Sequence, residues 1–356
     1  MAQTKTLAAP GVKTMTQRKR EEALTGYAFL TPAMIIFLVF LFLPIFFAVY
    51  ISFTDWNGIT PLSQENAYTF VGLDNYNRLL LQQGISQRDF YTALKNTVYF
   101  VIGVVPTQTV LALVLAVIVN QKWLRAKGAF RTAFYFPSIT SSVVISLIFM
   151  WMFSRGGIVN NFIGGAFPNY SSVDWLNDSN GLIHNFLGLF GVTRDTVGGW
   201  ASTRVASLTL WDWISGPSVT LFTIMVLNTW TTIGTLMIIF LAALQGIPSH
   251  VYEAAAVDGA TGFQAFRRIT VPLLKPTTFF VITLGLIGTF QVFDQIFVIS
   301  SGGPAKTTLT IAYIVYTNGF QNSAMGLAAA TAIILFVIIF AFSILQRRIT
   351  SDRADT

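Results

Sequence analysis

The chain has 356 residues, of which 53% are apolar and only 10% are charged, and it carries a formal net charge of +7. Soluble domains carry about 25% charged residues, so this composition excludes an ordinary soluble protein and indicates one embedded in lipid. Cysteine is absent and the two histidines, His184 and His250, stand far apart, which excludes disulfides, thiolate metal sites and the usual spacings of histidine metal ligands.

Six long apolar segments predict an all-α membrane protein with six transmembrane helices. Each segment approaches or exceeds the roughly 20 residues that a helix needs to cross a bilayer. The first is too long to be the core of a cleavable signal peptide, which spans about 7–15 residues. The segments lie at about 27–51, 97–119, 132–153, 217–244, 277–299 and 324–345. We therefore expect one transmembrane domain over 25–348, a flexible basic tail at 1–24 and a second tail at 349–356.

Prolines interrupt three of these segments, at Pro32, Pro44, Pro106 and Pro137. Spanning helices tolerate proline where neighbouring helices or hydroxyl groups satisfy the freed carbonyls. The sequence therefore predicts kinked helices, and a kinked bundle can enclose a cavity.

Lysine and arginine are distributed unequally between the two sides of the predicted membrane. If the N-terminus is inside, the inner segments (1–24, 120–132, 245–276 and the C-terminal tail) hold 5, 4, 3 and 3 of the 22 Lys and Arg residues. The outer segments hold the other 7 in much longer loops. Because inner loops are enriched in these residues, both termini are predicted to be cytoplasmic. This topology accounts for the net charge, so the charge gives no support to a nucleic-acid partner.

Two predicted outer segments are unusually long. Within residues 52–94, the stretch 70–76 (FVGLDNY) resembles the F-x-G-L-x-N-Y sequence common after the first span of sugar-type permeases. Residues 155–216 are rich in Gly, Asn, Ser, Asp and Trp, and their apolar part, 182–190, is too short to span and suits the membrane surface. We interpret 155–216 as an enlarged loop, which is either a surface for a soluble solute-binding protein or a plain connector.

Polar side chains recur at helical spacing in the fourth segment. They are Asn228, Thr231, Thr232 and Thr235. The sequence Asn228-Thr229-Trp230 resembles the matching span of maltose-type permeases, whose residues on this face touch the sugar. The resemblance implies that the four side chains bind a hydroxyl-rich solute, for which polar groups beside aromatics are suited. Thr232 and Thr235 stand where those permeases would have glycine and tyrosine, which leaves the sugar open. The alternative is that these groups hold helices together.

A polar stretch at 253–272 (EAAAVDGATGFQAFRRITVP) separates the fourth and fifth apolar segments, inside the loop 245–276. Its E-A-A start, Gly259 and its I-x-V-P end resemble the EAA signature of binding-protein-dependent ABC importer permeases, which usually ends in I-x-L-P. In that family the segment is a short cytoplasmic helix pair that docks in a cleft of the ATPase subunit. The alternative is an ordinary polar loop.

The residue types of this stretch suit a docking helix. Alanines are strong helix formers with little bulk, so such a helix can seat in a partner's groove. Glu253, expected near the helix start, is favoured by the helix dipole and can accept from a cation on the partner. Gly259 can take a left-handed conformation and end the helix. The predicted coupling residues are Glu253, Ala254, Ala255, Ala256, Asp258 and Gly259.

The fifth apolar segment ends in residues 289–304 (TFQVFDQIFVISSGGP), which resemble the F-D…GGP element of carbohydrate permeases. Gln291, Asp294 and Gln295 have the spacing i, i+3, i+4 and are predicted to share one helix face. An ionisable residue inside a span is a functional candidate, and Asp294 is the only charged residue in the six apolar cores. We add these three to the candidate substrate contacts. Because it lies near the outer end, Asp294 also suits helix capping or an outer gate.

No nucleotide-binding motif occurs in the sequence. Residues 301–308 (SGGPAKTT) lack the glycine before the lysine that a phosphate loop requires, and they are predicted to lie outside the cell. We therefore expect this chain to hold no cofactor or metal and to have no enzymatic activity, with ATP and magnesium bound by a separate ATPase chain.

Over residues 26–348 the chain is identified, by this resemblance, as the transmembrane subunit of a carbohydrate-type ABC importer with the type I permease architecture. The resemblance implies a multi-pass protein of a bacterial or archaeal plasma membrane that works by alternating access. Its implied partners are a second homologous permease, ATPase subunits, an extracytoplasmic solute-binding protein, membrane lipid and a sugar-like solute, whether oligosaccharide, monosaccharide or glycerol-phosphate ester. The alternative is a secondary transporter driven by an ion gradient, but the sequence shows no second copy of a long motif and only Asp294 as a proton site.

Overall fold

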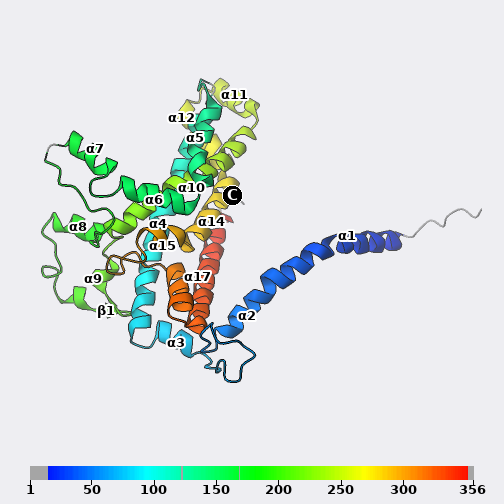
Figure 1. The fold of residues 1–356 in the computed structure, drawn as a ribbon. Coiled ribbons are helices and arrows are strands. Elements are labelled where there is room, and N and C mark those ends of the chain that lie inside the picture. The colour runs from blue at the N-terminus through cyan, green and yellow to red at the C-terminus, as the bar shows by residue number, and fades with distance from the viewer. Residues whose placement is uncertain (1–14, 122, 168, 352–356) are drawn as a thin grey trace, which may run out of the picture. The chain divides into compact units, whose positions relative to one another are not determined.

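The computed structural model describes residues 15–121, 123–167 and 169–351, and the chain divides into two units at residue 51. Each unit is described by itself (Figure 1). Three predicted inner lysines, Lys5, Lys13 and Lys122, lie outside the described residues, as do residues 352–356 of the predicted C-terminal tail.

The first unit is one continuous helical rod. It consists of α1 (Met15–Phe37), a π-helical turn η1 (Leu38–Phe42) and α2 (Leu43–Ile51). The π turn ends two residues before Pro44, which has no N–H group to donate, and the Leu43 amide reaches back five residues to the Leu38 carbonyl. Residues 15–24 belong to this helix, so the structure differs there from the flexible tail that the sequence predicts, because the helix continues back from the apolar segment into polar residues.

The second unit is helical apart from one small hairpin. Its first half contains α3 (Asp74–Leu80), α4 (Ile85–Asn120), α5 (Lys127–Ile139), α6 (Ser142–Met152), α7 (Ile158–Ala166), α8 (Leu182–Gly188), η2 (Gly199–Ser202), β1 (Arg204–Val205), β2 (Leu208–Thr209) and α9 (Leu210–Trp213). Its second half contains α10 (Val219–Gln245), α11 (Ser249–Val257), α12 (Gly262–Ala265), η3 (Phe266–Thr270), α13 (Val271–Leu273), α14 (Lys275–Phe290), α15 (Asp294–Ile299), α16 (Ile311–Tyr316), η4 (Thr317–Gln321) and α17 (Met325–Ser351).

Five helices among the described residues are long and apolar enough to cross a membrane, and a bent pair makes a sixth if it is one span. The five lie at Lys19–Ile51, Ile85–Asn120, Val219–Gln245, Lys275–Ile299 and Met325–Arg348. The bent pair is α5 and α6, whose axes meet at 101°. Thr140 and Ser141 have extended ψ angles of 147° and 127°, which end one helix and start the next. Apolar content alone predicts a single span here, because it does not register this bend.

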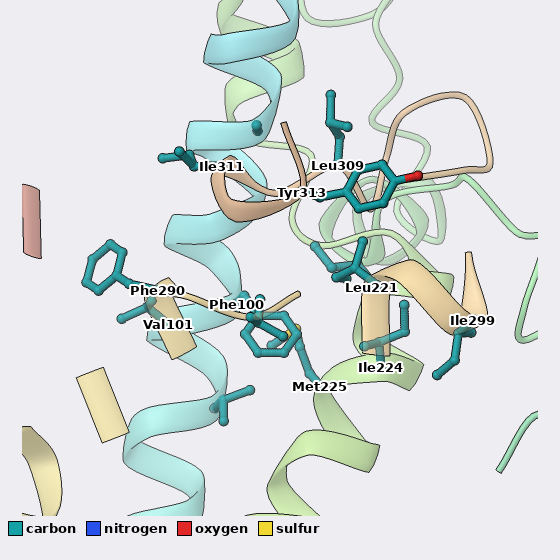
Figure 2. Close-up of a cluster of buried hydrophobic side chains, with 14 of the residues drawn as sticks. Phe100, Val101, Leu221, Ile224, Met225, Phe290, Ile299, Leu309, Ile311 and Tyr313 are labelled. Carbon is teal, nitrogen blue, oxygen red and sulfur yellow. The ribbon is translucent and has the colours of Figure 1, made fainter. Parts of the chain in front are cut away.

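The core of the second unit forms where α10 packs along α4. Figure 2 shows Phe100 and Val101 of α4 in one buried cluster with Leu221, Ile224 and Met225 of α10. A second cluster continues between the same helices toward the 245–276 loop and includes Leu274, which is buried. Burial of such side chains stabilises the packing by about 1.5–3 kcal/mol each in water, while in lipid close packing and polar contacts take that role.

Close approach of α5 to α10 depends on one glycine. A Cβ atom at Gly234 would overlap the backbone carbonyl of Phe134 in α5, so any side chain there would push the helices apart. The Ser138 hydroxyl of α5 then donates to the Thr231 carbonyl of α10 at 2.6 Å. The bent pair is thus held against the fourth apolar helix by a backbone contact and a hydrogen bond.

The 70–76 stretch and the loop after Gly302 are both held in place by polar contacts. Asn75, in the 70–76 stretch, is buried and donates to the carbonyls of Ser52 (3.0 Å) and Thr54 (2.7 Å). In the loop after Gly302, Lys306 forms an ion pair with Asp89 at the start of α4. These contacts fasten residues 52–54 to α3 and the loop between α15 and α16 to α4.

Candidate functional site

The loop between α10 and α14 projects from one end of the second unit, with α11 and α12 at its tip (Figure 1). A Schellman motif closes α11: Gly259 has φ of +76°, its amide donates to the Ala256 carbonyl at 3.1 Å, and the Ala260 amide donates to the Ala255 carbonyl at 2.9 Å. The prediction that Gly259 ends this helix in a left-handed conformation is therefore confirmed.

The second helix of the loop begins with its own cap. The Thr261 hydroxyl accepts from the Gln264 amide at 3.3 Å, and the Gln264 side chain accepts from the Thr261 amide at 2.8 Å. A hydrogen bond of 3.0 Å between the Tyr252 and Thr270 hydroxyls joins the two halves of the loop. These contacts give the polar stretch a defined shape, unlike an ordinary loop.

Two expectations about α11 are corrected by the structure. The helix begins at Ser249, so Glu253 lies in its second turn rather than near its start, beyond the strongest part of the dipole. Ala255 is 7% exposed and faces its own chain, so it cannot also fill a partner's groove. The other predicted coupling residues are exposed; they are Glu253, Ala254, Ala256, Asp258 and Gly259.

Large apolar side chains extend this exposed face. Val257 at the end of α11 is 89% exposed, and Phe263 in α12 is also exposed. Arg267 and Arg268 follow in η3, with exposed side chains. An exposed apolar surface bordered by charges is typical of a protein interaction site.

The polar residues of α10 form a buried cluster with a residue of α4. The Thr232 hydroxyl lies 2.7 Å from the side-chain amide oxygen of Gln108 and 2.8 Å from the Asn228 backbone carbonyl oxygen. Asn228 is 7% exposed, and its side-chain oxygen has no hydrogen-bond partner. A buried acceptor without a partner costs about 1–3 kcal/mol, so this atom is a candidate for contact with a bound polar molecule.

Gln108 belongs to this cluster but is absent from the sequence prediction. Its side chain is 1% exposed and packs against Gly285 of α14, where a Cβ atom would collide with it. The signal was available in the sequence, because Thr107-Gln108-Thr109 is a polar run in the middle of an apolar segment. Uncharged polar side chains inside spans, like charged ones, mark helix contacts or functional sites.

The other predicted substrate residues have different surroundings, and Thr231 adjoins this cluster. Thr231 is half-buried and its hydroxyl donates to the Asn228 carbonyl at 2.9 Å, while Thr235 is exposed on the same helix. Gln291 lines a largely apolar groove of about 470 Å³ with residues of α16 and α17.

The shared helix face predicted for Gln291, Asp294 and Gln295 is wrong. The helix breaks between Phe290 and Asp294, because Phe293 has φ of −134° and leaves the helical conformation. Asp294 is instead the exposed first residue of α15, where the positive end of a helix dipole favours its charge. Gln295 follows it and is half-buried.

The 155–216 loop contains ordered elements and buried polar anchors. The amide group of Asn160 accepts from the Tyr170 hydroxyl (2.6 Å) and the Trp175 indole (3.0 Å). The ring of His184 stacks on Trp211 with centroids 4.2 Å apart, and burial lowers the pKa of His184 below its usual value. Across the residues that the structure describes, no group of three or more His, Asp or Glu residues is placed to hold a metal ion.

Comparison with known proteins gives matches over most of the chain. Residues 108–354 match the family described as binding-protein-dependent transport system inner membrane component. The chain is 32% identical to the arabinooligosaccharides transport system permease protein of Halalkalibacterium halodurans, over 91% of this chain and 87% of that protein. It is 31% identical to the multiple sugar-binding transport system permease protein of Streptococcus mutans, over 94% of this chain and 98% of that protein.

A solved structure shares the fold. A chain of the bacterial alginate ABC transporter, in complex with alginate pentasaccharide-bound periplasmic protein, superposes with a TM-score of 0.69 at 22% identity. The superposition covers 94% of this chain and 97% of that chain.

Proposed function

The chain belongs to the family of binding-protein-dependent transport system inner membrane components, and on this premise we propose that it imports a sugar or sugar-like solute. As a member of that family it is a multi-pass inner membrane protein, a transport subunit rather than an enzyme, and it works with a solute-binding protein. The sugar assignment is supported by relatives whose names specify arabinooligosaccharides and multiple sugars. A second, homologous permease beside it and ATPase subunits on its cytoplasmic side complete the proposed importer.

The loop between α10 and α14 is the main structural support for the proposed ATPase partner, because its exposed face suits a docking contact. Glu253 offers an acceptor for a cation of the ATPase, and the small side chains of Ala254 and Ala256 allow close approach. Val257 adds the apolar anchor expected at the centre of an interface. Movement of the ATPases would be transmitted through Leu274, the buried residue that joins this loop to the helix core.

The proposed solute path runs past the buried polar cluster of α4 and α10. The unpartnered oxygen of Asn228 can accept from a sugar hydroxyl, and Gln108 holds the neighbouring Thr232 hydroxyl in place. Thr231, Thr235 and Gln291 remain candidate contacts in other conformations of the alternating-access cycle. Asp294 and Gln295 are proposed to shape the outer gate, since they begin the short helix after the break.

Single cysteines test the docking proposal cleanly, because the natural chain has none. A cysteine at Val257 should form a cross-link to the ATPase with a short bifunctional thiol reagent in the assembled importer. A cysteine at Ala255, two residues away and buried, is the matched control and should not. Equal cross-linking at both positions, or none at Val257 in an importer that retains uptake, would contradict the proposed contact.

A further inference from the structure

A cavity of about 560 Å³ opens between the first turns of α4 and the β1–β2 hairpin. Arg88 of α4, Arg194 of the large loop and Arg204 of β1 all line it. Among the described residues, none of these three side chains forms an ion pair or a hydrogen bond, and all three residues are exposed. Three cationic groups without acidic partners thus meet at one concave site.

The hairpin holds Arg204 next to α4. Arg204 pairs with Thr209 across the two strands, and the connecting residues Ala206 and Ser207 have φ of +50° and +67°, as in a tight type I′ turn. The Ser207 hydroxyl donates to the side-chain oxygen of Gln87, one residue before Arg88. Because this bond ties the turn to the helix, the arginines are presented by a defined scaffold rather than by a loose loop.

The one acidic residue that lines the cavity is already engaged. The Asp212 carboxylate accepts from the Thr209 amide at 3.0 Å and from the Thr209 hydroxyl at 2.7 Å, and it caps α9. Asp195 follows Arg194 in the chain and is exposed, but it does not line the cavity. The site therefore keeps an excess of positive charge.

The cavity lies far from the buried polar cluster. Arg88 and Gln108 are both in α4, 20 residues apart, which corresponds to about 30 Å along a helix axis. One small solute cannot touch both sites. A protein that docks on this end of the unit can fill the cavity while it releases solute toward the cluster.

We infer that this arginine-lined cavity receives carboxylate side chains of the solute-binding protein, an inference that rests on the function proposed above. Guanidinium groups bind carboxylates through paired, planar hydrogen bonds, which fits an acidic protein surface. Leu81, which lines the cavity, is 75% exposed and supplies the apolar contact usual beside such pairs.

The test uses the complete importer, with the second permease and the ATPases, and its purified, solute-loaded binding protein. ATP hydrolysis is measured against the concentration of binding protein. Substitution of all three arginines by glutamine should raise the half-stimulating concentration about tenfold and leave maximal stimulation unchanged. Substitution by lysine should restore only part of the affinity, because lysine keeps the charge but cannot form the paired, planar hydrogen bonds. Arg155→Gln, an exposed arginine of the same loop outside the cavity, is the matched control and should behave as the wild type.

Ionic strength provides a second readout. An increase from about 0.05 M to about 0.3 M should weaken stimulation of the wild type but not of the triple glutamine variant, because salt screens exposed charges. An unchanged half-stimulating concentration of binding protein in the triple glutamine variant would overturn the inference. The inference would also fall if the variant lost only the uptake of an anionic solute, because the arginines would then bind the solute itself. If the binding protein does not stimulate the wild-type importer, the proposed function falls and the inference with it.

Discussion

Substitution of Gly259 by valine tests whether the shape of the 249–274 loop couples this chain to the ATPase. A Cβ atom at this position meets no atom within 4 Å, so the substitution causes no collision. Its cost is conformational, because φ of +76° costs an ordinary L-residue about 1–2 kcal/mol and a β-branched residue more.

Relief of this strain would require the backbone to leave the left-handed region. The two capping hydrogen bonds, from Gly259 to Ala256 and from Ala260 to Ala255, would then be lost at about 0.5–1.5 kcal/mol each. A strain of about 1–2 kcal/mol, the cost for an ordinary L-residue, already lowers the equilibrium population of the docking conformation of the loop roughly 5- to 30-fold. Because the strain is confined to a loop outside the apolar helices, membrane insertion should be retained.

The assay is co-purification of the ATPase subunits, normalised to the amount of inserted permease, together with ATP-driven uptake. Gly259→Val should lower both, whereas Gly259→Asn should be milder because asparagine tolerates the left-handed region. Gly262→Ala is the matched control, since Gly262 also lies in open space but has no positive φ. Normal recovery and normal uptake with Gly259→Val would refute the reasoning.

Three further predictions follow from other sites. Asn228→Ala should weaken solute affinity about 5- to 150-fold through loss of one buried hydrogen bond, measured as the concentration dependence of uptake, and an unchanged dependence would make Asn228 structural. Asn75→Ala should lower the free energy of unfolding by about 1–3 kcal/mol, seen as a lower melting temperature in detergent, because two loop carbonyls lose their donor; an unaltered melting curve would argue against this role. The folded-state pKa of His184 lies below its unfolded value, so its contribution to stability is present above about pH 6.5 and is lost as pH falls below it. Amide hydrogen exchange in α8, corrected for intrinsic rates, should therefore quicken at about pH 5, and His184→Phe should abolish this pH dependence; equal protection at both pH values would contradict the assignment.

Local signals predicted the long apolar helices and the helix end at Gly259, for reasons that particular residues illustrate. The apolar segments stand out because lipid requires long runs without charge, and the spans found at α4, α10, α14 and α17 follow from that requirement. Gly259 could be assigned from the sequence because a glycine after an alanine-rich helix is the common Schellman terminus.

Features that depend on tertiary contacts escaped prediction. The 101° bend between α5 and α6 and the break after Phe290 lie inside long segments that are apolar on average, and the few polar residues at each break are too few to divide the segment by composition. The burial of Ala255 depends on which face of α11 meets the rest of the chain. The pairing of Gln108 with Thr232 depends on the packing of α4 against α10, because the two residues are 124 positions apart in the chain.

The central claim, that this chain is a transport subunit driven by separate ATPases, is tested most directly by reconstitution into liposomes. We expect the purified chain alone neither to hydrolyse ATP nor to accumulate solute, and the complete importer to accumulate solute only with ATP and the solute-loaded binding protein. Robust uptake by this chain alone, driven by a proton or sodium gradient, would contradict the account.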